Sequence, residues 1–279
     1  MTNDSHFNPC FWTALWNDMY LETVIRGPGM SRIPRDELVA CLNLCTRRVR
    51  TTKVSTVHKH KGIGFVEFTY ASAKKYREAL VRIGKTPPAV RKWRADDAVF
   101  LDAEAFFSGL ETMPTYKAVL DVVRNGKIGC PTEKINLASF FVIHNERLAA
   151  AWLARPNRLL NQKDHNLEHL LLLKQRLADH EYLFSRVVPL VTGAWYVHAY
   201  SKSVLLLGDS GFPASDTDFM AAISPRHLVV IDVQRSMHAH LFPTFQNGDL
   251  DLAEKYNQRV ASLSRYEIIG PQSELEKIS

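Results

Sequence analysis

The sequence lacks the features that mark a secreted or membrane-spanning protein. Its 279 residues include only four cysteines, and these follow no disulfide-framework spacing, which suits a reducing compartment. No apolar run approaches the roughly 20 residues that span a bilayer. The first thirty residues do not combine a basic start with an apolar stretch, as a secretory signal would. We therefore expect a cytoplasmic protein without a membrane partner.

Several common enzyme motifs are also missing. The chain contains no phosphate loop, no dinucleotide fingerprint and no Gly-x-Ser-x-Gly elbow, which argues against ATP-dependent and Rossmann enzymes. Internal repeats and low-complexity tracts are not visible either. What is present is a composition with 46% hydrophobic and 23% charged residues, which suits a chain that buries a substantial core.

Extended and helical patterns occur in separate blocks along the chain. A basic, β-rich block covers about 38–94, a helical block about 104–192, and a second β-rich block about 195–270. This order predicts an α+β fold in a single domain spanning 1–279. We expect a central helical bundle packed with a mixed or antiparallel sheet, built from N-terminal and C-terminal strands.

Individual elements follow from local patterns. Extended patterns predict hairpins over 38–52 and 195–207 and a buried strand over 227–233. Apolar residues on nearly every face predict a buried helix over 137–153. Asp164 is a good N-cap for a helix running towards Phe184, and an amphipathic helix is expected over 250–263.

Positive charge is concentrated in one segment. Residues 47–94 contain 14 Lys or Arg and two acidic residues, a net charge of +12, so the remainder carries −6. Such segregation costs self-repulsion and points to a polyanionic partner such as nucleic acid, although a solvated basic face explains the pattern equally well. The candidate substrate-binding residues of this segment are Arg47, Arg48, Arg50, Lys59 and Lys61.

Five short motifs occur together in a fixed order. His6-Phe-Asn-Pro9 is followed by aromatic residues up to Trp16, and residues 140–147 form an apolar stretch that ends in His144 and Arg147. Later motifs are Trp195 before the strand end at Asp209, residues 223–228 with the sequence Ile-Ser-Pro-Arg-His-Leu, and Asn257 in the last helix.

In this order the motifs resemble the family called domain of unknown function 4238, over nearly the whole chain. That family has no settled activity, so the resemblance implies candidate residues and not a reaction. We add Trp195 and Asn257 to the substrate-binding candidates on this basis. The chain departs from the family's Ser-Asp-x-Pro motif at Gly208-Asp209-Ser210-Gly211, which puts a role for that serine in doubt.

The main catalytic hypothesis joins His6, His144, Arg147 and Asp209. His144 and Arg147 are three residues apart and share one helix face, and Asp209 follows an apolar strand. Together a His, an Arg and an Asp could supply a general base, a phosphate clamp and an orienting or metal-binding carboxylate. The alternative is a structural ion pair between Arg147 and Asp209 that holds helix to sheet.

A second pattern is that of a zinc peptidase. His165-x-x-Glu168-His169 matches the spacing in which two His bind the metal and Glu activates water, with Glu254 as an imaginable third ligand. Because Asp164 would cap this helix, the pattern falls in its first turn, and a solvent-exposed pair is the better interpretation. His58/His60 and His238/His240 have no nearby acid or Cys to complete a site, so we assign no metal ligands.

Three functions follow from these observations. The first is a nucleic-acid-directed hydrolase, such as a nuclease-like toxin or bacterial defence effector, whose cofactor is unknown and for which a divalent metal is the candidate. The second is a non-catalytic nucleic-acid or protein-binding module. The third is the zinc peptidase. The sequence does not determine the oligomeric state.

Overall fold

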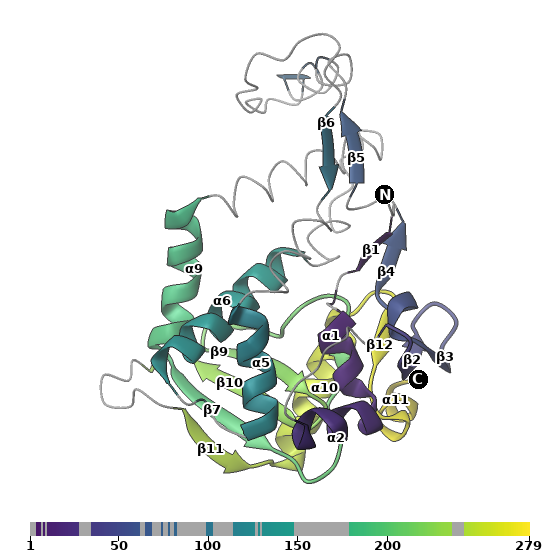
Figure 1. Cartoon of the computed structure of the whole chain (residues 1–279), viewed down its shortest axis with the longest axis vertical. Helices are drawn as coiled ribbons and strands as arrows, with labels where there is room; N and C mark the ends of the chain where they lie inside the picture. The colour runs from purple at the N-terminus through teal and green to yellow at the C-terminus, as the bar shows by residue number, and fades with distance from the viewer. Residues whose placement is uncertain are drawn as a thin grey trace.

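The computed structural model has the α+β architecture that the sequence predicts (Figure 1). It describes residues 4–6, 8, 10–27, 35–61, 65–68, 74, 78, 81–82, 99–102, 114–125, 128, 130–147, 179–235 and 243–279. Helices dominate the middle of this described part, and strands lie on either side of it in the sequence.

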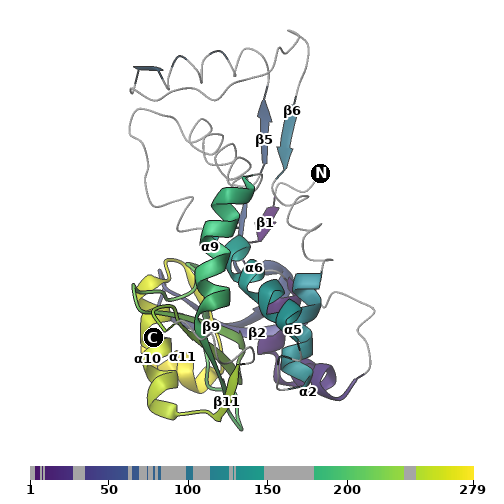
Figure 2. The ribbon, with the colours of Figure 1, turned by 90° about the vertical axis from the view of Figure 1, so that its left-hand side faces the viewer.

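One four-stranded sheet is built only from C-terminal strands, in the order β11-β7-β10-β9. Its members are β7 (Ala194–Ala199), β9 (Asp218–Ser224), β10 (His227–Asp232) and β11 (Thr244–Asn247). Strand β10 pairs antiparallel with β7 and β9, whereas β11 runs parallel to β7. Helices cover both faces of this sheet (Figure 2), which explains why β9 and β10 are apolar in near-continuous runs instead of alternating.

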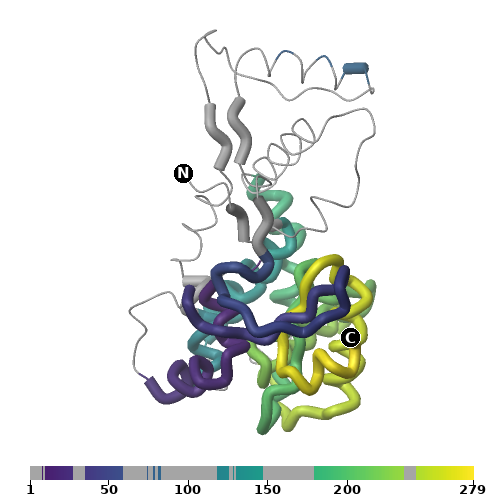
Figure 3. The backbone as a smooth tube through the Cα atoms, turned by 90° about the vertical axis from the view of Figure 1, so that its right-hand side faces the viewer, coloured from purple at the N-terminus to yellow at the C-terminus, as the bar shows by residue number. Residues whose placement is uncertain are grey.

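The other four-stranded sheet joins the two ends of the chain. It has the order β3-β2-β12-β8 and consists of β2 (Leu38–Asn43), β3 (Arg48–Lys53), β8 (Leu207–Gly208) and β12 (Glu267–Ile269). All of its pairs are antiparallel. This sheet confirms both the hairpin predicted over 38–52 and the shared sheet of N-terminal and C-terminal strands. Figure 3 shows the β2–β3 hairpin beside the C-terminal segment.

The hairpin predicted over 195–207 is wrong. Strand β7 forms there, but its partners are β10 and β11, and residues 203–206 are not a strand. The backbone N–H groups of Val204 and Leu205 donate to Pro225 O, at 3.0 and 3.1 Å. These bonds carry the chain from one sheet to the other, where β8 pairs with β12.

In the described part of the helical block, three helices pack in succession. They are α5 (Pro114–Asn125), α6 (Pro131–Arg147) and α9 (His180–Thr192), with α6 in contact with both others. Helix α5 begins at Pro114, where a missing N–H costs nothing. The expected helix from Asp164 to Phe184 is not continuous, because Asp179 N-caps α9 through Tyr182 N at 3.0 Å. Its first part, with the His165/His169 pair, lies outside the described residues.

Short helices flank this arrangement at both ends of the chain. Helix α1 (Cys10–Thr13), the 3₁₀ helix η1 (Ala14–Trp16) and α2 (Asp18–Arg26) follow the N-terminal strand. At the C-terminal end, α10 (Leu250–Leu263) confirms the predicted closing helix, and α11 (Gln272–Ile278) follows β12. Asn17 caps α2 and Asp249 caps α10 with side-chain acceptors.

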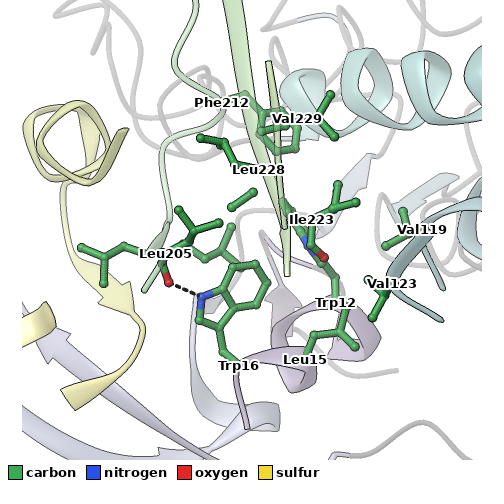
Figure 4. Close-up of a cluster of buried hydrophobic side chains, with 14 of the residues drawn as sticks. Trp12, Leu15, Trp16, Val119, Val123, Leu205, Phe212, Ile223, Leu228 and Val229 are labelled. Atoms are coloured by element: carbon green, nitrogen blue, oxygen red, sulfur yellow. Dashed lines mark hydrogen bonds between the residues drawn. The ribbon is translucent and has the colours of Figure 1, made fainter. Parts of the chain in front are cut away.

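The core is centred on two tryptophans from the N-terminal helices (Figure 4). Trp12 is fully buried and donates its indole N–H to Ile223 O at 3.1 Å. Trp16 donates to Leu205 O at 2.9 Å, the bond drawn in Figure 4. Each tryptophan therefore buries a large apolar ring and satisfies its polar N–H on a backbone group more than 180 residues away.

Two further strands of the basic segment are described, and each belongs to a short ladder. After the 3₁₀ helix η2 (Val54–Thr56), β4 (Lys59–Lys61) pairs antiparallel with β1 (Asp4–His6). Strand β5 (Phe65–Phe68) pairs with β6 (Val99–Asp102). Both ladders extend away from the two four-stranded sheets (Figures 1 and 2), so β4 and β5 lie outward of the sheet edge that β3 forms.

Candidate functional site

The N-terminal motif reaches the strand end that precedes Asp209. His6 lies in β1 opposite Lys59. Two residues later, the fully buried Asn8 donates from Nδ2 to Gly208 O at 2.9 Å. The structure thus brings the His6 and Asp209 segments together through the backbone of β8.

Asp209 is 1% exposed, and its carboxylate is occupied by backbone donors. Oδ1 accepts from Arg265 N at 2.9 Å and from Ser210 Oγ at 3.0 Å. Oδ2 accepts from Tyr266 N at 2.8 Å and Glu267 N at 3.0 Å. A carboxylate with this many fixed donors organises the start of β12, and action as a base or metal ligand would require some of these bonds to break.

His144 lies in an aromatic cage on α6. The residue is 3% exposed. Its ring meets the Trp12 ring edge-on, with the ring centroids 4.8 Å apart, and stacks on the Phe140 ring, with the centroids 5.6 Å apart. Phe212 contributes a third wall at 5.2 Å. Arg147 is the last residue of α6, and its side chain is outside the described part of the chain.

The loop after Asp209 contacts the end of α6. Phe212, which touches His144, donates its backbone N–H to Asn145 Oδ1 at 3.3 Å. The segments that carry His144 and Asp209 are therefore neighbours, separated by an aromatic ring. The joint catalytic role of these residues stays a prediction.

His58 forms a buried polar cluster that the sequence analysis missed. It is 2% exposed and has a positive φ of 53°, which is uncommon for a residue with a side chain. Its Nδ1 lies 2.5 Å from Asn8 Nδ2, its Nε2 lies 3.2 Å from Glu267 O, and its backbone N–H donates to Glu267 Oε2 at 2.9 Å. This arrangement fits a neutral ring that accepts at Nδ1 and donates at Nε2.

Glu267 extends this cluster to the basic strand. Arg50 Nη2 donates to Glu267 Oε1 at 2.8 Å. Cys41, which lies opposite Arg50 in the β2–β3 register, is fully buried. Burial, reinforced by the negative charge of Glu267, raises the pKa of the Cys41 thiol to about 12, so this thiol stays protonated and is not an activated nucleophile.

The other substrate-binding candidates divide into surface and interior residues. Arg47, Arg48 and Arg50 are exposed on β3 and the turn before it. Lys59 and Lys61 lie on β4, of which only the backbone is described. Trp195 and Asn257, by contrast, are buried at 2% and 5% exposure.

The side chains of both interior residues form hydrogen bonds with backbone groups. Trp195 donates its indole N–H to Leu190 O at 2.6 Å, and Lys134 lies over its ring at 5.5 Å. Asn257 accepts from Leu206 N at 3.0 Å and donates to Val204 O at 2.8 Å. These bonds give Trp195 and Asn257 structural roles, and their contact with a substrate stays a prediction.

A hollow of about 550 Å³ lies on the C-terminal sheet. Its walls come from β7, the start of β9, and the end of β10 with the turn after it. They consist of Tyr196, Thr217, Asp218, Val230, Asp232, Gln234 and Arg235. No sequence pattern marks this site, because its residues become neighbours only through the pairing of β10 with β7 and β9.

The described residues contain neither a group of metal-ligand type nor a membrane-spanning helix. In these ranges no three His, Cys, Asp or Glu side chains group as metal ligands would, and the His165/His169 pair lies outside them. None of the described helices has the length and apolar character needed to cross a membrane.

Comparison with known proteins gives no identification: no family model, curated protein or solved structure matches this chain.

Proposed function

We propose that this chain is a non-catalytic nucleic-acid-binding protein that contacts phosphates through β3. The observation that supports this most is the group of exposed basic side chains on that strand and the turn before it. It comprises Arg47, Arg48, Arg50 and Lys53. Strand β3 is an edge strand of its sheet, so one edge of its backbone is not paired with another strand of that sheet.

Three of these four side chains have weak partners or none, whereas Arg50 is held in an ion pair by Glu267 Oε1 at 2.8 Å, and the Glu267 side chain is 13% exposed. Lys53 pairs with Asp36 at 3.0 Å, where both side chains are more than half exposed, and such pairs contribute about 0–1 kcal/mol. Arg47 donates to the backbone of Ile278 at 3.3 Å. Among the described residues Arg48 has neither an ion pair nor a side-chain hydrogen bond. A phosphate can therefore bind Arg48 without displacing another group.

The charge of the sequence also favours a polyanionic partner. Residues 47–94, which include β3, carry +12, against −6 for the rest of the chain. The next described strand, β4, contains two more lysines and lies on a ladder that extends outward (Figure 1). A polyanion is attracted to residues 47–94 more strongly than to the rest of the chain. Basic residues also discourage pairing of an edge strand with another chain, and a binding measurement separates the two roles.

A nucleic-acid hydrolase is the second candidate, and one observation favours it. The loop after Asp209 touches the end of α6 on one side, and Asn8 binds the residue before Asp209 on the other. Three of the segments proposed to form the catalytic centre are thus adjacent. We rank the non-catalytic function above the hydrolase because the carboxylate of Asp209 already accepts four hydrogen bonds.

Membership in the domain of unknown function 4238 family also stays a proposal. Its support is that residues of separate motifs bond or touch one another: Trp12 donates to Ile223 O and contacts His144, and Asn257 holds the chain before Asp209. Motif residues with mutual contacts suit a shared fold more directly than a shared reaction.

Fluorescence anisotropy with labelled duplex DNA and duplex RNA tests the proposed function. We expect wild-type protein to bind at low salt, and Arg48→Gln to bind about three- to tenfold more weakly. Lys202→Gln removes the same charge from an exposed turn away from β3 and should bind as wild type. Absence of binding, or equal weakening by both variants, would contradict a specific role for β3.

The same samples separate binding from hydrolysis. We expect both nucleic acids to stay intact in the presence and absence of Mg²⁺. Cleavage by wild-type protein that is lost in His144→Gln, with the folded state verified by circular dichroism, would instead support the hydrolase and reject the non-catalytic function.

A further inference from the structure

The hollow on the C-terminal sheet has an apolar and aromatic floor. Tyr196 on β7 and Val230 on β10 are opposite each other in the register, and both are partly exposed. Neighbouring cross-strand side chains of such a pair share one face of the sheet. The floor therefore offers a ring and an aliphatic surface on which a planar ligand can lie.

Of the two carboxylates in the wall, Asp218 forms an ion pair and Asp232 does not form one with a described residue. Asp218 is neutralised by Arg259, whose Nη1 lies 3.0 and 3.2 Å from the two oxygens, and it also accepts from Ser215. Asp232 accepts the backbone N–H groups of Gln234 and Arg235 with Oδ1 alone, at 3.1 and 3.0 Å. Within the described residues its Oδ2 has no donor.

The wall also contains a cation without a carboxylate partner. Arg235 is exposed, and its Nη1 donates to the hydroxyl oxygen of Tyr196 at 3.2 Å. It forms no ion pair with Asp232 or with another described acid. A free acceptor and a free donor thus line one hollow without neutralising each other.

This arrangement selects against simple ions. An anion attracted by Arg235 meets the charge of Asp232, and a cation attracted by Asp232 meets Arg235. A ligand that satisfies both must present hydrogen-bond donors along one edge and acceptors along an adjacent edge. A flat aromatic shape would let it also stack on Tyr196.

We propose that the hollow is a binding site for a guanine base, in a free nucleoside or an unstacked nucleotide. Guanine offers N1–H and N2–H to Oδ2 of Asp232, and O6 and N7 to Arg235, the pairing that guanidinium groups make with this base. Tyr196 supplies the stacking surface. The volume of about 550 Å³ is within the range of small-molecule sites.

This site is distinct from the phosphate contacts proposed for β3. It lies on the other four-stranded sheet and recognises the base, not the phosphate. Guanosine, which has no phosphate, therefore tests it without involving the basic surface.

Titration of the full chain with guanosine, followed by calorimetry or NMR shift changes, tests the proposal. We expect saturable binding that is roughly tenfold weaker for adenosine and cytidine, and roughly tenfold weaker in Asp232→Asn and Arg235→Gln. Asp232→Asn keeps the Oδ1 acceptor of the turn, so the fold is retained. Lys202→Gln, with a lost charge at the other end of β7, should bind guanosine as wild type.

Three results would overturn the inference. They are no saturable guanosine binding, equal binding of all three nucleosides, and unchanged affinity in both hollow variants. Binding of glucose in place of guanosine would reassign the hollow to a polyhydroxy ligand, and it would contradict the base-recognition proposal. None of these results bears on nucleic-acid binding through β3, which Arg48→Gln tests separately.

Discussion

Asp209 accepts the backbone N–H of Tyr266 at 2.8 Å across 57 residues of sequence. This bond belongs to a set in which one buried carboxylate satisfies three consecutive backbone donors at the start of β12. β8 and β12 are paired over only two residues, so the side chain of Asp209 provides much of the connection between them. The residue that the motif marks as a candidate catalyst therefore acts as a structural link in the fold.

Asp209→Ala should strongly destabilise the protein. The change leaves three partly buried backbone N–H groups without their charged acceptor, and each such loss costs about 1–3 kcal/mol when the group is shielded from water. We expect the free energy of unfolding to fall by about 3 kcal/mol or more, measured by urea denaturation.

The control for this change is Asp216→Ala. Asp216 is an exposed acid in the same loop region, and its side chain accepts none of these bonds, so the expected change is within about 0.5 kcal/mol. Equal stability of Asp209→Ala and wild type would show that the carboxylate is not structural and would reopen a catalytic role.

Asn257→Leu should destabilise the crossing between the two sheets. Leucine has the branching of asparagine and the same number of side-chain heavy atoms, but it leaves Leu206 N and Val204 O without their partners inside the core. We expect a loss of about 2–4 kcal/mol in the free energy of unfolding. The neighbouring exposed Gln258→Leu should change stability little, and a similar loss in both variants would argue against this explanation.

Stability should fall in mild acid because of His227. Burial, with a smaller contribution from the nearby Arg226 charge, lowers the pKa of His227 from 6.5 to about 4. Between these values the unfolded chain binds a proton that the folded chain excludes, so stability decreases as pH falls from 6.5 towards 4. The contribution of this residue is roughly 3 kcal/mol, measurable by urea denaturation across this pH range.

His227→Asn is the matched variant for the acid effect. Its amide oxygen can accept from Ser224 Oγ, as His227 Nδ1 is placed to do at 2.9 Å, and it does not titrate. Burial also lowers the pKa of His198, so some acid sensitivity should remain. A variant with the same pH dependence as wild type would exclude His227 as the main cause.

Local sequence patterns correctly predicted the elements whose own residues indicate a helix or a strand. The closing helix has an amphipathic pattern and an acidic N-cap, and β10 is a continuous apolar run, so both were found close to their observed bounds. The prediction of the second hairpin failed because Val204 and Leu205 look like a strand but donate to Pro225 O, in the turn between β9 and β10. Extended residues do not reveal which neighbour they will pair with.

The candidate site was only partly predictable for the same reason. The motifs indicated that the His6 and Asp209 segments matter, and the two do meet through Asn8 and Gly208. The partners of Asp209 are backbone groups, which carry no sequence signal. The burial of His58 could not be predicted either. In the sequence it belongs to a basic run, but in the fold it is buried against Asn8 and Glu267, which are 50 and 209 residues away.

The salt dependence of nucleic-acid binding tests the central claim most directly. For a duplex DNA, the logarithm of the association constant falls against the logarithm of salt concentration by about 0.9 for each phosphate contacted. If β3 contacts phosphates through Arg48, Arg48→Gln should make this slope shallower by about one, while Lys202→Gln leaves it unchanged. Binding that is insensitive to salt, or a slope identical in wild type and Arg48→Gln, would contradict a phosphate-contacting role for β3.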